Sequence, residues 1–542
     1  MMHDGSALNL VEMTPDGLTS GVIPLQDTPP PPAPSDSDQA GSLLRPGDTC
    51  WRVERADRMA VIVDAQDYFR TLKHALLNAR HQVLLIAWDF DTRIRLEPDK
   101  DQPTPKGAPD KLGRYLAWLI RGRPDLQVHV LKWRFSGLWG LMRGMTPLWI
   151  LNLMSGRRLH YRVASDHPLG ACHHQKIVVI DDRIAFCGGI DITAERWDTR
   201  GHLDDDPRRR GPGPKLYEPY HDMTAIVDGD AAKSLGDLAR LRWFHATGEK
   251  LPVPPRDADE KDVWPEKLQS LFDCPMVGIA RTQPAFSGQE EAVEIERLWI
   301  AAIRAAKRHI YIEAQYFACR RIGKALVERL EEPDGPEIVV INPTVANGWL
   351  EEAAMGRARD HIMNALCALD PDGKRFACYA PVTPKGIRIY VHAKLLIVDD
   401  QILRIGSSNM NNRSMGVDTE CDLAVALGRD SADEEGRVRL RALRDGLIAE
   451  HLGISLPLAA RTIDEKGSLI AAIEALRQPK GKTLIPVNCQ EVNAAETYLV
   501  EQALLDPERP RFPFQSFFHR LDWGWARRRR ARRMKRDGHS LR

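Results

Sequence analysis

The chain has 542 residues, of which 43% are hydrophobic and 28% are charged, and its formal net charge is +1 at pH 7. This length accommodates two domains of ordinary size, and the charge gives no global signal for nucleic acid or for an acidic substrate. The nine cysteines show no C-x-x-C spacing, so we expect neither a disulfide framework nor a zinc ribbon, and a reducing, cytoplasmic compartment. The N-terminus has no secretory signal pattern, and signal-free export would leave the same sequence.

The first 46 residues include a proline-rich tract and are predicted to form a disordered leader. No uninterrupted run of eighteen apolar residues occurs in the sequence. The nearest approach is 138–154, which is broken by Arg143, Pro147 and Asn152. We predict a buried helix there, with an interfacial patch that touches lipid as the alternative.

The two halves of the chain show the same order of elements. In each half a helical pattern precedes a buried strand, and a second helix and strand follow. These elements are predicted at 65–80, 83–89, 111–121 and 128–133, and again at 294–308, 310–317, 323–330 and 337–341. Such alternation predicts an α/β fold, a mixed sheet flanked by helices in each of two similar domains.

One motif, H-x-K-x-x-x-x-D, occurs in both halves. Its residues are His174, Lys176 and Asp181 in the first copy and His392, Lys394 and Asp399 in the second. The residues between Lys and Asp are apolar, as in a buried strand. Residues i and i+2 of a strand point to one face, so each copy presents an imidazole beside an ammonium group, a pair that suits a phosphate. The two motif Asp residues lie far along the strand and are expected to be structural groups rather than proton carriers.

Small residues follow each motif and suggest where a phosphate would bind. Gly189, Ser407 and Ser408 are expected to shape the pocket, and the amide of Asn409 could donate to a phosphate oxygen. Asp191 stands where Asn409 stands in the other copy, so the two half-sites cannot contact phosphate identically. The half-sites lack the clustered carboxylates that Mg²⁺ or Ca²⁺ would need, so we expect no metal and no cofactor.

A strand with an acidic residue near its start follows each motif. These residues are Asp222 and Glu420. A carboxylate behind a catalytic histidine fixes its tautomer and stabilises the imidazolium. The alternative is a solvated acid at a strand end.

Composition divides the remaining chain. We predict a first domain at 47–247, a proline-rich, charged linker at 248–264 and a second domain at 265–460. A helical cap without a catalytic role is predicted at 461–522. The tail at 523–542 combines tryptophans with many arginines and is expected to bind anionic lipid, with nucleic-acid binding or a plain solvated tail as alternatives.

The paired motifs resemble the catalytic motifs of the phospholipase D superfamily, over roughly residues 50–460. The segments 189–198, 220–222 and 310–317 are similar to those of its phosphatidylcholine-cleaving branch, of bacterial type. The resemblance implies two domains packed face to face around one shared active site. It also implies that Asp222 supports His174 and that Glu420 supports His392.

The resemblance further implies a mechanism. His174 would attack phosphorus to form a phosphohistidine, while His392 would protonate the leaving group and then activate water or an alcohol. Lys176, Lys394 and Asn409 would bind the non-bridging oxygens. The sequence alone permits the two histidines to exchange roles.

The implied substrate is a glycerophospholipid at a membrane surface, converted to phosphatidic acid and a head-group alcohol by a monomeric, peripheral enzyme. A cardiolipin synthase-type phosphatidyltransferase and a metal-independent nuclease are the alternatives. A lipid-binding module without activity is disfavoured because both motifs are complete.

Overall fold

The structure, a computed structural model, describes residues 43–99, 105, 107–133, 157–213, 215–255, 261–344, 355–428, 433–489 and 506–508. The predicted leader, except for its last four residues, lies outside the described residues, as do the predicted helix at 138–154 and the basic tail. Among the helices that are described, none is both long and apolar enough to cross a membrane.

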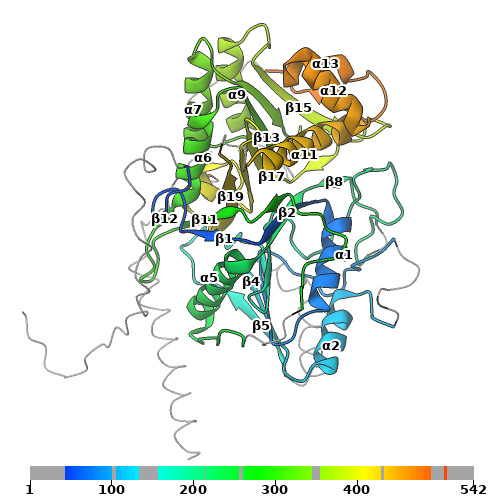
Figure 1. The fold of residues 1–542 in the computed structure, drawn as a ribbon, viewed down its shortest axis with the longest axis vertical. Helices are drawn as coiled ribbons and strands as arrows, with labels where there is room; N and C mark the ends of the chain where they lie inside the picture. Colours follow the sequence, from blue (N-terminus) through cyan, green and yellow to red (C-terminus); the bar gives the residue numbers. More distant parts are fainter. Residues whose placement is uncertain are drawn as a thin grey trace, which may run out of the picture. The chain divides into compact units, whose positions relative to one another are not determined.

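The first half of the chain supplies most of a mixed eight-stranded sheet (Figure 1). From edge to edge its strands are β10 (Phe272–Asp273), β2 (Arg58–Val63), β9 (Met223–Asp228), β7 (Ile184–Gly188), β6 (Ile177–Ile180), β3 (Gln82–Ala87), β4 (Gln127–Trp133) and β5 (Leu159–Ala164). Strands β3, β4 and β5 are parallel, and β6 joins β3 in antiparallel register. The motif strand β6 is therefore central and fully buried, as its apolar sequence requires.

The second half repeats this order in a ten-stranded sheet. Its strands are β1 (Arg52–Arg55), β11 (Met276–Gln283), β19 (Glu420–Ala426), β18 (Ile402–Gly406), β17 (Lys394–Val398), β13 (His309–Ala314), β14 (Glu337–Ile341), β15 (Phe376–Val382) and β20 (Thr483–Pro486), with β12 (Ala292–Val293) paired to β11. The motif strand β17 again lies next to the strand that follows the first helix. The predicted mixed α/β fold, with one sheet in each half, is confirmed.

The two sheets exchange edge strands. Strand β1 precedes β2 in the chain but pairs with β11 of the second sheet, and β10 precedes β11 but pairs with β2 of the first. The exchange is reciprocal, so each half completes the edge of the other. The sequence predicts two consecutive domains and carries no signal for this exchange of edge strands.

Helices cover the outer faces of the sheets, and the inner faces share one core. On the first sheet, α1 (Ala65–Leu76) and α2 (Leu112–Gly122) pack into one apolar cluster. On the second, α6 (Glu294–Ala305), α7 (Arg320–Glu331) and α9 (Arg357–Leu369) do the same (Figure 1). Between the sheets, residues of both halves form a continuous cluster that includes Ile177 and Leu395. This burial holds the motif strands face to face.

Further helices follow β9, β18 and β19. They are α5 (Gly229–Thr247), α10 (Asn412–Gly416), α11 (Glu434–Leu452), α12 (Leu456–Lys466) and α13 (Leu469–Leu476). The predicted cap is helical only in part, because β20 follows α13 and joins the second sheet at β15. The cap therefore extends the sheet instead of lying wholly outside it.

The sequence predicts no disulfide framework, and the structure contains one disulfide that the sequence did not indicate. Cys367 of α9 and Cys489 form a disulfide, with Cα atoms 6.8 Å apart. The two residues are 122 positions apart in the sequence, and no spacing signal links them. Packing of the segment after β20 against α9 brings them together. The other seven cysteines are free.

Candidate active site

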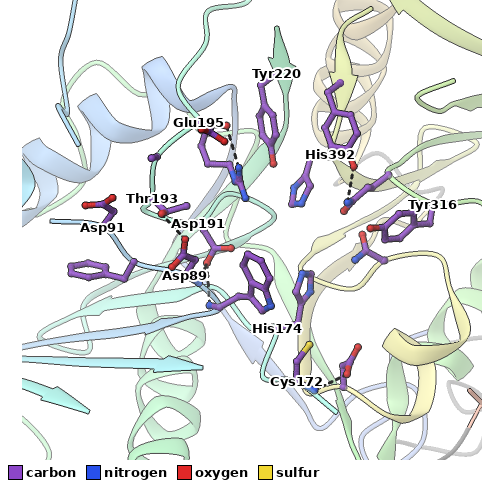
Figure 2. Close-up of a pocket in the computed structure, with 18 of the residues that line it drawn as sticks. Asp89, Asp91, Cys172, His174, Asp191, Thr193, Glu195, Tyr220, Tyr316 and His392 are labelled. Carbon is purple, nitrogen blue, oxygen red and sulfur yellow. Dashed lines mark hydrogen bonds between the residues drawn. The ribbon is translucent and has the colours of Figure 1, made fainter. Parts of the chain in front are cut away.

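His174 and His392 line one cavity of about 880 Å³ between the two sheets (Figure 2). Each histidine lies just before the motif strand of its own half, two residues ahead of the motif lysine. In Figure 2 the two imidazoles approach the cavity from separate segments. The structure therefore brings the two motif copies to one site.

Each histidine segment pairs with the acid-bearing segment of the opposite half. The backbone N–H of His174 donates to the carbonyl of Thr419 over 2.9 Å, and that of His392 donates to the carbonyl of His221 over 2.7 Å. The second contact continues a short parallel ladder between β8 (Tyr220–His221) and β16 (Tyr390–Val391). These contacts place Glu420 beside His174 and Asp222 beside His392.

The assignment of carboxylates to histidines inferred from the resemblance was therefore wrong. Nδ1 of His174 lies 3.0 Å from both carboxylate oxygens of Glu420, and Nδ1 of His392 lies 2.6 Å from Oδ2 of Asp222. Each half supplies the histidine of one pair and the carboxylate of the other. Because the carboxylate takes Nδ1, Nε2 is the ring nitrogen left for chemistry.

Sheet order explains the exchange of partners. Within the first sheet, β7 separates β6 from β9, and Asp222 precedes β9. Neighbouring strands are about 4.8 Å apart, so a residue two strands away is about twice that distance from His174 and beyond hydrogen-bond reach. Only the face-to-face packing of the halves brings a carboxylate close enough.

The small residues expected to bind phosphate instead contact the carboxylates. Ser407 Oγ donates to Glu420 over 2.5 Å, and Ser408 Oγ donates to Asp422 over 2.6 Å. At Gly189 a Cβ atom would lie 2.1 Å from Oδ1 of Asp222, so only glycine leaves room for that carboxylate. We therefore assign these three residues to the support of buried acids, because each of them contacts a carboxylate or leaves room for one.

Asp191 and Asn409 occupy equivalent positions in the two motif copies but have different partners in the structure. Both line the cavity. Asp191 accepts from two backbone N–H groups and forms an ion pair of 3.2 Å with Lys176. Oδ1 of Asn409 is buried and has no hydrogen-bond partner within the described part of the chain. Lys394 instead donates to Oε1 of Gln315 over 3.0 Å, so the two ammonium groups have different partners.

The motif carboxylates Asp181 and Asp399 lie at the far ends of their strands. Each accepts hydrogen bonds from three consecutive backbone N–H groups, those of residues 80–82 and 307–309, over 2.6–2.9 Å. Both residues have positive φ values of 51° and 53°. These contacts make the two residues anchors for the turn that begins β3 or β13. They also explain why α1 ends at Leu76, before the predicted residue 80.

Burial sets the charge state of the histidines and carboxylates of the site. It lowers the pKa of both His174 and His392 well below the usual value, and the neighbouring motif lysines lower it further. Burial also raises the pKa of Asp222 and of Glu420. Neutral imidazole, the nucleophilic form, is thus favoured at neutral pH, and a bound anion would favour protonation.

Several cavity residues were not among the predicted site residues. Trp88 follows β3, and its ring lies 6.2 Å from that of His174 in an edge-on arrangement. Arg196 is 5.1 Å from the ring of Tyr220, and both line the cavity. Tyr316 and Tyr390 complete an aromatic part of the wall. In a sequence, aromatic and basic residues just after predicted buried strands are the candidates for such a cavity wall.

The fold and the site define a class of protein: two similar α/β halves that place paired His-Lys motifs around one cavity. A family model described as phospholipase D matches residues 366–484, which contain the second motif. This match, together with the relatives described below, supports the phospholipase D superfamily for this chain.

Two curated relatives extend the match to the first half. Phospholipase D A of Dictyostelium discoideum is 25% identical over 452 residues, covering 70% of this chain and 34% of that protein. Phospholipase D alpha 1 of Nicotiana tabacum is 24% identical over 513 residues, covering 70% of this chain and 63% of that protein. The chain thus spans about a third to under two thirds of the length of these relatives.

A solved structure shares the fold. The phosphatidylserine synthase of Haemophilus influenzae Rd KW20 superposes with a TM-score of 0.51 at 12% identity, covering 78% of this chain and 96% of that one.

Proposed function

We propose that the protein is a phospholipase D-type phosphodiesterase that forms a phosphohistidine intermediate. One observation supports this most strongly: His174 and His392, from opposite halves, line one cavity, and each has its Nδ1 held by a carboxylate. This arrangement supplies one nucleophile and one acid-base group that act on the same phosphorus.

In the first step Nε2 of His174 attacks phosphorus and the bond to the head-group oxygen breaks. His392, protonated when the anionic substrate is bound, gives its proton to that oxygen and releases the head-group alcohol. Glu420 stabilises the positive charge that develops on His174 during attack. The product is a phosphatidyl group on His174.

In the second step His392 accepts a proton from water or an alcohol as its oxygen attacks phosphorus. The P–N bond breaks and frees His174. Water yields phosphatidic acid, and an alcohol yields a new phosphodiester. Asp222 stabilises the imidazolium of His392.

Lys176, Lys394 and Asn409 are proposed to bind the non-bridging oxygens. Both lysines lie directly beside the histidines, since Lys176 Nζ donates to the carbonyl of His174 and Lys394 Nζ lies 3.0 Å from Nδ1 of His392. The amide of Asn409 faces the same cavity. These donors would stabilise the charge of the transition state.

The substrate is proposed to be a glycerophospholipid, and the partner a membrane surface. The names of the relatives support this proposal, as does the aromatic wall of the cavity. We propose a monomer that docks peripherally, with the basic tail as the expected contact. That tail lies outside the described residues.

Ethanol tests the proposed intermediate. Purified protein incubated with phosphatidylcholine vesicles and a few per cent ethanol should form phosphatidylethanol alongside phosphatidic acid, because one base can activate either hydroxyl group. Lipid mass spectrometry measures both products. A protein denatured before the assay gives the background.

The outcomes separate the candidate functions. Hydrolysis without alcohol transfer at any tolerated ethanol concentration would contradict the phosphohistidine. Cardiolipin formed from phosphatidylglycerol in preference to phosphatidic acid would indicate the phosphatidyltransferase. Cleavage of single-stranded DNA with vesicles untouched would indicate the nuclease.

The affinity for substrate should fall as the pH rises above 7. Burial lowers the pKa of Lys394 to about 7. Its ammonium form is therefore present below that pH and lost above it, and the neutral amine cannot bind a phosphodiester anion. On a soluble short-chain substrate, KM should rise by up to about tenfold per pH unit above 7.

Lys394→Arg is the matched control, because a guanidinium stays charged across this range. Its KM should be nearly independent of pH, whatever its turnover. An equal rise of KM in both proteins would assign the effect to another group.

A further inference from the structure

A second group of histidines and carboxylates lies outside the cavity. It consists of Asp64, which follows β2, His202, His221 of β8 and Glu450 of α11. Asp64, His202 and His221 are at most 1% exposed, and Glu450 is 9% exposed. Three of these residues come from the first half and one from the second. None of them is among the predicted site residues.

The spacing of the four side chains is nearly uniform. Nε2 of His202 lies 3.4 Å from Oδ2 of Asp64 and 3.2 Å from Oε1 of Glu450. Nδ1 of His221 lies 3.1 Å from Oδ1 of Asp64 and 3.3 Å from the same Glu450 oxygen. Each imidazole thus presents one nitrogen to both carboxylates.

These distances match the edges of a coordination tetrahedron. Bonds of 2.0–2.1 Å from zinc to nitrogen and oxygen give ligand-to-ligand edges of about 3.3 Å. Charge-assisted hydrogen bonds are shorter, at about 2.7–2.9 Å, and the His392–Asp222 contact of 2.6 Å shows what a close pair looks like in this protein. All four nitrogen-to-oxygen distances of the cluster have the longer spacing, with Asp64 facing His202 through Oδ2 and His221 through Oδ1.

The outer nitrogen of each histidine is held by a further carboxylate. Nδ1 of His202 lies 3.1 Å from Oδ2 of Asp198, and Nε2 of His221 lies 2.8 Å from Oε2 of Glu313. A metal-bound histidine usually donates its other ring N–H in this way, which fixes the tautomer that ligates. The inner nitrogens then carry lone pairs directed at the carboxylates.

Two of the inner atoms make no hydrogen bond. Within the described part of the chain, Oδ2 of Asp64 and Nδ1 of His221 have no hydrogen-bond partner, although both are buried. An unpartnered buried carboxylate oxygen is costly unless a cation compensates it. Asp64 also has a positive φ of 64°, a strained conformation for a non-glycine residue, at the point where it enters the cluster.

We propose that Asp64, His202, His221 and Glu450 bind a structural divalent transition-metal ion of the zinc class. Two nitrogen and two oxygen ligands suit zinc, whereas Ca²⁺ and Mg²⁺ prefer oxygen alone. Four protein ligands leave no open position, so the ion would not act on substrate. None of the four ligands belongs to the His-Lys motifs, so the proposed site stands whether or not the proposed activity does.

The position of the ion would serve the catalytic pair. His221 immediately precedes Asp222, and the backbone N–H of Asp64 donates to the carbonyl of Asp222 over 2.8 Å. Asp222 N in turn donates to Oδ1 of Asp64. A metal here would join α11 of the second half to the segment that orients His392.

Elemental analysis of the purified full chain tests the proposal. We expect about one equivalent of zinc or a similar ion per chain. After removal by a chelator, cobalt(II) should restore one equivalent and give the intense visible absorption of a tetrahedral site. X-ray absorption of the zinc protein should show two imidazole ligands.

His202→Asn and Asp64→Asn should each lower the bound metal at least tenfold. His309→Asn is the matched control, since His309 is a buried histidine beside Asp400 but outside the cluster, and it should retain the full equivalent. If the variants do not fold, X-ray absorption of the wild-type protein still gives the number of imidazole ligands on the metal. Wild-type protein that neither contains nor takes up zinc, cobalt or manganese, or unchanged stoichiometry in both ligand variants, would overturn the proposal and leave two imidazolium ions paired with carboxylates.

Discussion

Replacement of His174 or of His392 by alanine is expected to lower turnover on phosphatidylcholine by about 10³- to 10⁵-fold, since the two groups act in series on one phosphorus. The double variant should be little worse than either single one, because residues that act as a unit are not additive. Steady-state assays on vesicles measure the loss.

An activated substrate separates the two histidines. With a p-nitrophenyl phosphodiester the leaving group needs no proton, so His392→Ala should still release p-nitrophenol in a burst and leave the phosphoryl group on the peptide that contains His174. His174→Ala should give no burst. His160→Ala, which alters a histidine stacked on His129 outside the cavity, is the control. Near wild-type turnover in either catalytic variant would contradict the two-histidine mechanism.

Neutralising Glu420 or Asp222, the carboxylates that orient the two histidines, should give the second largest loss of turnover. Glu420→Gln and Asp222→Asn keep the side-chain shape but remove the charge that supports each imidazolium, and a loss of about 10²- to 10⁴-fold is expected for each. The cross-half pairing predicts which step fails. Glu420→Gln impairs attack by His174, and Asp222→Asn impairs proton transfer by His392.

The same activated substrate measures this difference. The burst of p-nitrophenol should survive in Asp222→Asn and disappear in Glu420→Gln. The opposite result would mean either that the pairing follows the order of the sequence or that the histidines exchange roles. The burst in His392→Ala decides between these explanations, because it identifies the nucleophile independently.

Much of the fold and of the site could be predicted from the sequence. The repeated H-x-K-x-x-x-x-D pattern identifies His174 and His392, since a buried strand with a polar pair at its start has a recognisable period. The alternation of helices and strands predicts a mixed sheet in each half. Strand β14 occupies the predicted residues 337–341, and α1 begins at the predicted residue 65. These features depend on local patterns of side chains, which a sequence displays directly.

The contacts between the halves were decided by the tertiary structure. The exchange of β1 and β10 and the pairing of Glu420 with His174 depend on how two sheets pack, and residues 246 positions apart leave no local signal. Ser407 appeared to be a phosphate ligand because its sequence position follows the motif, but its hydroxyl group binds Glu420. The cluster of Asp64, His202, His221 and Glu450 draws on four separate segments. Local periodicity determines which residues form each strand, whereas burial of the shared core determines which strands, and therefore which side chains, meet.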